Sequence, residues 1–172
     1  MTFCVTGNRP EKFPFNYYNT ASLEMTAYFT CLKNLVSEYL SRGYTRFITG
    51  MARGVDIDFA EQVVNFKNTF RQYKDVVIEA AVPHKGQADR YDVRSKRKYD
   101  FIISNCDKVT FLSDEYSSDC FFKRNRYMVD NSDSVIAFWN GDASGGTFYT
   151  INYARERGKD IRLISLKTMT EK

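Results

Sequence analysis

The sequence has few of the residues that build metal centres and disulfide frameworks. It contains one histidine and four cysteines among 172 residues, and no two cysteines form a CxxC pair. A zinc site therefore lacks its usual ligands, and scattered cysteines of this kind are typical of reduced thiols in a cytosol. We expect no metal, no required cofactor and a cytoplasmic protein.

Long apolar runs are also missing. No stretch approaches the roughly 18 apolar residues that a membrane span needs, and the first residues have neither the basic nor the apolar region of a signal peptide. Hydrophobic residues make up 43% and aromatic residues 16% of the chain, a composition typical of a globular domain rather than a disordered one. Without a linker-like segment, residues 1–172 are predicted to form one domain that binds no membrane.

Short apolar runs alternate with helical patterns along the whole chain. The runs lie at residues 2–6, 44–49, 76–82, 107–112, 134–139 and 161–166, and the helical patterns begin near residues 28, 55, 89, 119 and 147. The alternation predicts an α/β fold, in which a mostly parallel sheet of about six strands carries helices on both faces. In such sheets, ligands bind outside the carboxyl ends of the strands.

Three of the predicted strands end at glycine-rich turns. The turns carry Gly7, Asn8 and Arg9, then Gly50, Arg53, Gly54 and Asp56, and last Ser144, Gly145, Gly146 and Thr147. Glycines let a ligand approach the backbone closely, and helix N-termini attract anions. The spacing matches neither the dinucleotide fingerprint GxGxxG nor a Walker A loop. These turns predict a composite site for a phosphate-bearing ligand.

Some residues of these turns have two possible roles. Asp56 either caps the first turn of its helix or accepts a ribose hydroxyl, and Thr147 is expected both to cap its helix and to donate its hydroxyl. Arg124 and Arg126 flank an asparagine shortly before the fifth predicted strand. They either clamp a phosphate or form structural pairs with nearby aspartates.

Taken in order, five segments resemble the YpsA-like branch of the SLOG superfamily, which also includes the SMF/DprA DNA-processing proteins and the LOG phosphoribohydrolases. The segments are GNRP, GMARGVD, VPHKGQADRY, KRNRYMVDNSDSVIAFWNG and SGGTFYTINYA. The resemblance covers about residues 2–166 and implies a Rossmann-like domain, bacterial or phage, that binds a nucleotide or a nucleotide-derived ligand such as an NAD-derived or ADP-ribose-like molecule. It also implies a homo-oligomer, by analogy with the LOG proteins.

The resemblance places the ligand on a defined set of positions. These are Gly7, Arg9, Gly50, Arg53, Gly54, Asp56, Arg124, Arg126, Gly145, Gly146 and Thr147.

One departure from the LOG enzymes bears on activity. Their PGGxGTxxE pattern ends in a catalytic glutamate, whereas here Ser144 replaces the proline and Thr150 stands where that glutamate would fall. Loss of this carboxylate favours a non-catalytic sensor or sequestering protein over a phosphoribohydrolase-like enzyme. The remaining acid/base candidates, Asp56 and Glu61, lie about 140° apart on an ideal helix and do not form a natural pair.

A third interpretation is a binder of single-stranded nucleic acid. Six basic residues lie between Lys85 and Lys98, with Tyr91 among them, and the RNR at 124–126 is shared with DprA-like proteins. Basic grooves with stacking rings suit single strands, although the same charges also fit solvated helix faces. Three further rings that either stack on a base or pack within the fold are His84, Tyr116 and Trp139.

Overall fold

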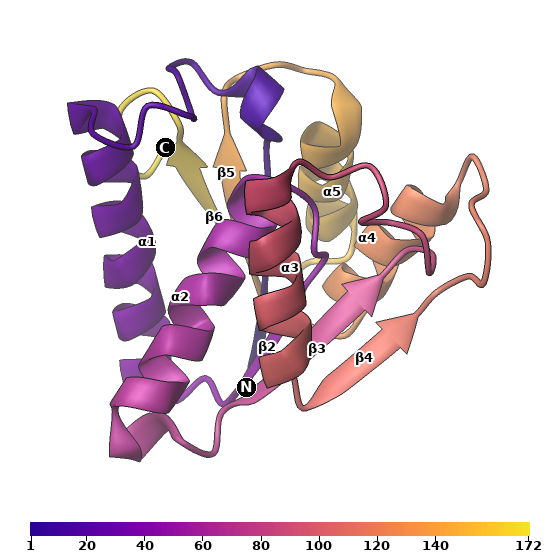
Figure 1. Cartoon of the computed structure of the whole chain (residues 1–172), viewed down its shortest axis with the longest axis horizontal. Helices are drawn as coiled ribbons and strands as arrows, with labels where there is room; N and C mark the ends of the chain where they lie inside the picture. The colour runs from indigo at the N-terminus through magenta and orange to yellow at the C-terminus, as the bar shows by residue number, and fades with distance from the viewer.

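A computed structural model describes residues 1–172 (Figure 1). The strands are β1 (Thr2–Gly7), β2 (Arg46–Thr49), β3 (Val77–Val82), β4 (Lys108–Phe111), β5 (Ser134–Trp139) and β6 (Asp160–Ser165). The α-helices are α1 (Leu23–Ser41), α2 (Val55–Thr69), α3 (Val93–Asn105), α4 (Cys120–Asp130) and α5 (Gly145–Glu156), and two short 3-10 helices are η1 (Pro10–Lys12) and η2 (Arg71–Tyr73). The predicted α/β fold with six strands is confirmed.

The strands form one parallel sheet in the order β4-β3-β2-β1-β5-β6. The chain winds outward from β1 to β4 and then returns to the other side of β1, where β5 and β6 complete the sheet. The order therefore reverses between β1 and β5, which pair from Phe3 with Ser134 to Gly7 with Phe138. Neighbouring connections leave in opposite directions at such a reversal, and this opens a crevice beyond the carboxyl ends of the two strands.

Helices cover both faces of the sheet (Figure 1). α1, α2 and α3 lie over the larger apolar cluster, which holds 30 buried residues and includes the contacting rings of Phe3 and Phe47. α4 and α5 lie over a cluster of 7 buried residues that includes Met128 and Ala154. None of the helices combines the length and apolar character that crossing a membrane requires.

Local caps explain where three helices differ from the sequence-based expectation. α1 begins at Leu23 rather than near residue 28, because the Ser22 hydroxyl accepts the N–H of Met25 at 3.2 Å. α3 begins at Val93 rather than near residue 89, because the Asp92 carboxylate accepts the N–H of Ser95 at 2.9 Å and so fixes the N-cap. α5 begins at Gly145, with Ser144 as its N-cap. The expected cap role of Thr147 is therefore wrong, since this residue lies inside the first turn of the helix.

Candidate functional site

A cavity of about 400 Å³ opens at the carboxyl ends of β1 and β5, and we refer to it below as the switch cavity. Of the thirteen residues predicted to bind a ligand, nine line it. The four that do not are Gly50, Arg53, Gly54 and Arg126. The structure thus brings the first and third glycine turns together with Asp56 and Arg124.

The exit of β1 forms the floor of the switch cavity. A Cβ at Gly7 would lie 2.5 Å from the side chain of Val55, so the absence of a side chain lets the first turn of α2 pack directly on β1. Asn8 is buried, and its Oδ1 accepts the N–H of Asn140 at 2.9 Å. This hydrogen bond ties the exit of β1 to the exit of β5 across the reversal in strand order.

Arg9 is an exposed cation that lines the switch cavity; the other, Lys12, lies 3.7 Å from the Asp142 carboxylate. The guanidinium carbon of Arg9 lies 5.3 Å from the centroid of the Phe121 ring, and Arg9 forms no ion pair with a carboxylate of the protein. The cation–π contact orients the side chain while leaving guanidinium N–H groups available. Such a group suits a phosphate or carboxylate ligand, which it can bind with two parallel hydrogen bonds.

The second glycine turn packs against Arg124 and Asn8, two residues that line the switch cavity. A Cβ at Gly50 would collide with the Arg124 guanidinium, and the Gly50 carbonyl accepts hydrogen bonds from Arg124 and, at 3.2 Å, from Gln87 Nε2. Gly54 has a φ of +86°, and a Cβ there would lie 2.8 Å from the Asn8 carbonyl oxygen. These two glycines therefore allow close packing inside the protein. They were predicted to contact a ligand, but atoms of Arg124 and Asn8 lie against them instead.

Asp56 and Arg124 form a buried ion pair beside the cavity. Arg124 Nη1 lies 3.4 Å from Asp56 Oδ2, and the same oxygen accepts the N–H of Ala52 at 3.4 Å. Burial raises the pKa of Asp56 to about 6, against the opposing effect of Arg124, the Ala52 N–H and Arg9. The predicted capping role of Asp56 is wrong, because the N-cap of α2 is Gly54. The Asp56 carboxylate instead orders Arg124 and, through the Ala52 N–H, the second turn.

The N-terminus of α5 contributes unbonded backbone donors. The N–H groups of Gly145, Gly146 and Thr147 donate to no acceptor within the protein, and all three residues line the switch cavity. Gly145 has a φ of +84°, a conformation that favours glycine. Three free N–H groups at the positive end of a helix dipole form an anion-binding arrangement.

Several predicted residues lie away from the switch cavity. Arg53 is held by Glu11 and by Asp92, whose carboxylate lies 3.7 Å away. Arg126 points to the other side of α4, where it donates to the Tyr149 hydroxyl at 3.0 Å. Of the pair predicted to clamp one phosphate, Arg124 lines the switch cavity and Arg126 does not.

The acid/base candidates are similarly separated. Glu61 pairs with Lys98 at 2.7 Å on the far side of α2 from Asp56. Thr150, at the position that corresponds to the LOG glutamate, is buried, and its hydroxyl donates to the Gly146 carbonyl at 2.8 Å. It does not line the cavity.

Sequence reasoning missed a wall of the cavity that comes from the start of α4. Ser118, Phe121 and Phe122 line it there. They lie in a stretch without glycine, and no spacing rule marks them. The helical period offered the only signal, because Phe121 and Arg124 are three residues apart and share one face of α4.

Half of the basic stretch is neutralised within the protein. Lys85 pairs with Asp114 at 2.7 Å, Lys96 pairs with Asp100, and Lys98 is held by Asp58 and Glu61. Arg94 lies over the Tyr17 ring, 5.6 Å from its centroid. The other three basic residues, Arg90, Arg94 and Arg97, form no ion pair with a carboxylate, and Arg90 and Arg97 are exposed.

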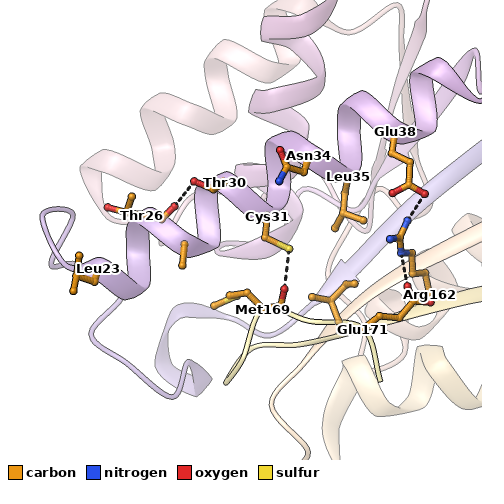
Figure 2. A pocket seen from close by; sticks show the side chains of 12 residues that line it. Leu23, Thr26, Thr30, Cys31, Asn34, Leu35, Glu38, Arg162, Met169 and Glu171 are labelled. Carbon is orange, nitrogen blue, oxygen red and sulfur yellow. Dashed lines mark hydrogen bonds and ion pairs between the residues drawn. The ribbon is translucent and has the colours of Figure 1, made fainter.

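A second cavity, of about 520 Å³, lies between α1 and β6 with its C-terminal turn (Figure 2). Its one cation, Arg162, is held between Glu38 and Glu171, and the Cys31 thiol lies 3.7 Å from the Met169 carbonyl oxygen. Because these polar groups already have partners, this cavity offers a ligand less than the switch cavity does.

The chain thus forms a Rossmann-type α/β domain with a crevice at the reversal of its strand order. A family model described as the YspA SLOG family, YpsA, matches residues 3–169. The chain belongs to this SLOG family.

Two relatives in sequence are similar to most of the chain. The chain is 22% identical over 157 residues to a UPF0398 protein of Bacillus thuringiensis (strain Al Hakam), covering 90% of this chain and 83% of the relative. A UPF0398 protein of Bacillus cereus (strain AH187) shows the same identity and coverage.

Among solved structures, DNA processing protein A from Helicobacter pylori, described for its single-stranded DNA binding mode, is similar with a TM-score of 0.62 and 16% identity. The match covers 95% of this chain and 65% of that one, so our chain corresponds to about two thirds of its length. At this identity the similarity establishes the shared fold.

Proposed function

We propose that this domain binds the phosphate of a nucleotide or nucleotide-derived ligand in the switch cavity and acts as a sensor or sequestering protein. The observation that carries the proposal is the convergence of three unbonded N–H groups of α5 with the unpaired Arg9 guanidinium on one cavity. Both are donors to anions, and a polyanionic group satisfies them together.

The carboxylates around the cavity support binding rather than cleavage. Asp56 is paired with the buried Arg124, and Glu11 is paired with Arg53. Cleavage of an N-glycosidic bond requires a carboxyl group free to protonate or stabilise the separating fragments. With both engaged by arginines and Thr150 turned to the backbone, none is positioned for that role.

Isothermal titration with AMP, NAD, ADP-ribose and cyclic ADP-ribose tests the proposal. We expect at least one to bind, and Arg9→Gln to weaken it about 10- to 100-fold, as loss of a charge-assisted hydrogen bond does. Arg71→Gln is the matched control, because Arg71 is exposed in η2, which precedes β3 and so lies at the amino ends of the strands, opposite the switch cavity. Folded wild-type protein that binds none of the four would overturn the proposal.

Chromatography of AMP after incubation tests the non-catalytic part separately. We expect AMP to be recovered intact. Release of free adenine that disappears in Asp56→Asn would instead identify an enzyme, with Asp56 as its acid/base group.

Binding of single-stranded DNA is a second candidate function. It is favoured by the solved structure of DNA processing protein A, which has this fold and binds single-stranded DNA. Of the six charges that point to it in the sequence, three are paired with carboxylates, those of Lys85, Lys96 and Lys98. A gel shift of a poly(dT) oligonucleotide that weakens steeply as salt rises would support this function, and no shift at low salt would reject it.

A further inference from the structure

A groove of about 840 Å³ adjoins the switch cavity. Arg9 and Phe121 line both spaces, so the two share one wall. The groove extends beyond the carboxyl ends of β3 and β4, where His84 and Tyr116 follow the strands. A ligand held by its phosphate at the switch cavity therefore has an adjoining space, reached past Arg9, for the rest of the molecule.

Three rings from separate segments meet in this groove. The centroid of the His84 ring lies 5.6 Å from that of Tyr116 and 6.1 Å from that of Phe121, and Tyr116 and Phe121 are 6.3 Å apart. Tyr116 nevertheless keeps 67% of its surface exposed. An exposed aromatic cluster on the wall of a groove offers a planar ligand a surface on which to stack.

Gln87 provides an independent sign of a missing polar partner. It lines the groove and is 7% exposed. Its Nε2 donates to the Gly50 carbonyl, which fixes the amide, while Oε1 is buried and has no hydrogen-bond partner. A buried acceptor without a donor is unfavourable, and an N–H group at the edge of a heteroaromatic ring is one donor that would satisfy it.

The balanced charge of the groove favours an uncharged base over a second phosphate. Its three arginines, Arg9, Arg53 and Arg90, are balanced by three acids. The acids are Asp89, Asp114 and Glu115. A groove with balanced charge and an aromatic wall suits an uncharged ring better than an anion.

We propose that this groove binds the heteroaromatic base of the ligand, so that the protein selects nucleoside phosphates over sugar phosphates. The inference rests on the proposed function, since it takes the phosphate to lie in the switch cavity. Arg9 and Phe121, at the shared wall, then contact the part of the ligand that connects the base to the phosphate.

Titration of AMP and ribose 5-phosphate, which differ in the base alone, tests this inference. We expect wild type to bind AMP at least tenfold more tightly than ribose 5-phosphate. Tyr116→Ala should weaken AMP about 5- to 150-fold, the range for loss of base stacking on an aromatic ring, and leave ribose 5-phosphate unchanged. Phe70→Ala is the control, because Phe70 is an aromatic residue, 41% exposed, that follows α2 at the amino ends of the strands, away from the groove.

The outcomes separate this inference from the proposed function. Equal affinity of wild type for the two compounds, or an equal loss for both in Tyr116→Ala, would overturn the base-binding groove and leave the phosphate site standing. Failure of wild type to bind either compound would overturn the base-binding groove, and failure to bind NAD, ADP-ribose and cyclic ADP-ribose as well would overturn the proposed function. Because Tyr116 is largely exposed, its replacement should not affect folding, and an unchanged melting temperature verifies this.

Discussion

Asp56 on α2 and Arg124 on α4 meet inside the protein with 3.4 Å between Oδ2 and Nη1, although 68 residues separate them. Burial penalises both charges: it raises the pKa of Asp56 and lowers that of Arg124. The pair joins helices from opposite faces of the sheet at the point where the switch cavity opens.

We expect this pair to stabilise the folded protein more at acidic pH than at neutral pH. The pKa of Asp56 is about 6 in the folded protein, above the 3.8 of an exposed aspartate, so the folded state binds more protons between these pH values. The contribution of Asp56 is therefore fully present below pH ~4 and is lost, by up to about 3 kcal/mol, as pH rises through 6.

Urea denaturation of wild type and Asp56→Asn between pH 4 and 7 measures this effect. The stability of wild type relative to Asp56→Asn should decline across that interval, because the amide does not titrate. A relative stability that is flat or rises with pH would contradict the expectation.

Glu79 on β3 should give the opposite dependence. It is fully buried, and burial alone would raise its pKa, but hydrogen bonds from Thr110, Tyr127, Arg46 and Lys108 lower it to about 2. Its contribution is present above pH ~4.5 and is lost as pH falls towards 2. Glu79→Gln should therefore destabilise the protein by about 1–3 kcal/mol at pH 7, and by less at pH 3. Denaturation at the two pH values decides this, and an equal loss at both would refute it.

Two glycines of the site should respond differently to alanine. At Gly7 the new Cβ would lie 2.5 Å from Val55, and we expect Gly7→Ala to cost about 1–3 kcal/mol of folding free energy. At Gly146 the nearest atom is Asn125 Nδ2 at 3.7 Å, an ordinary contact, so Gly146→Ala should fold with stability within about 1 kcal/mol of wild type. Thermal melts compare them, and similar losses in both would show that the close approach of Val55 is not what requires Gly7.

The buried Asp58 should depend strongly on Lys98. Its carboxylate accepts hydrogen bonds from Tyr17, Tyr28 and Lys98, the last at 2.8 Å. Lys98→Met removes the compensating charge, and we expect a loss of about 3–5 kcal/mol. Adding Asp58→Asn should recover part of that loss, because no uncompensated charge then remains. A double variant no more stable than Lys98→Met would argue against charge compensation.

The sequence predicts the sheet and the glycine turns because each depends on local pattern. Alternating apolar runs locate all six strands, and Gly43, with a φ of +86°, ends α1 as the helical period indicates. Helix starts are less predictable, since Asp92 fixes the start of α3 through a side-chain bond that any nearby polar residue could have supplied.

The local sequence pattern only partly predicts which arginines face the switch cavity. Arg124 and Arg126 are two residues apart on a helix, about 200° around its axis, so they cannot both point at one phosphate. Arg53 lies in a turn, where no period applies, and its direction is set by Glu11 and Asp92 from distant segments. Phe121 shares one face of α4 with Arg124, but only tertiary packing brings that face to the cavity.

The hydrogen bond from the Asn140 N–H to Asn8 Oδ1 has a consequence for how the site forms. It joins two strand exits that the ladder of the sheet no longer holds, so the crevice between them cannot widen without breaking a bond to a buried side chain. The crevice is therefore completed in the same cooperative step that assembles the sheet. For the ligand proposed above, the binding geometry would then be ready made, and the entropy of arranging it would belong to folding rather than to recognition.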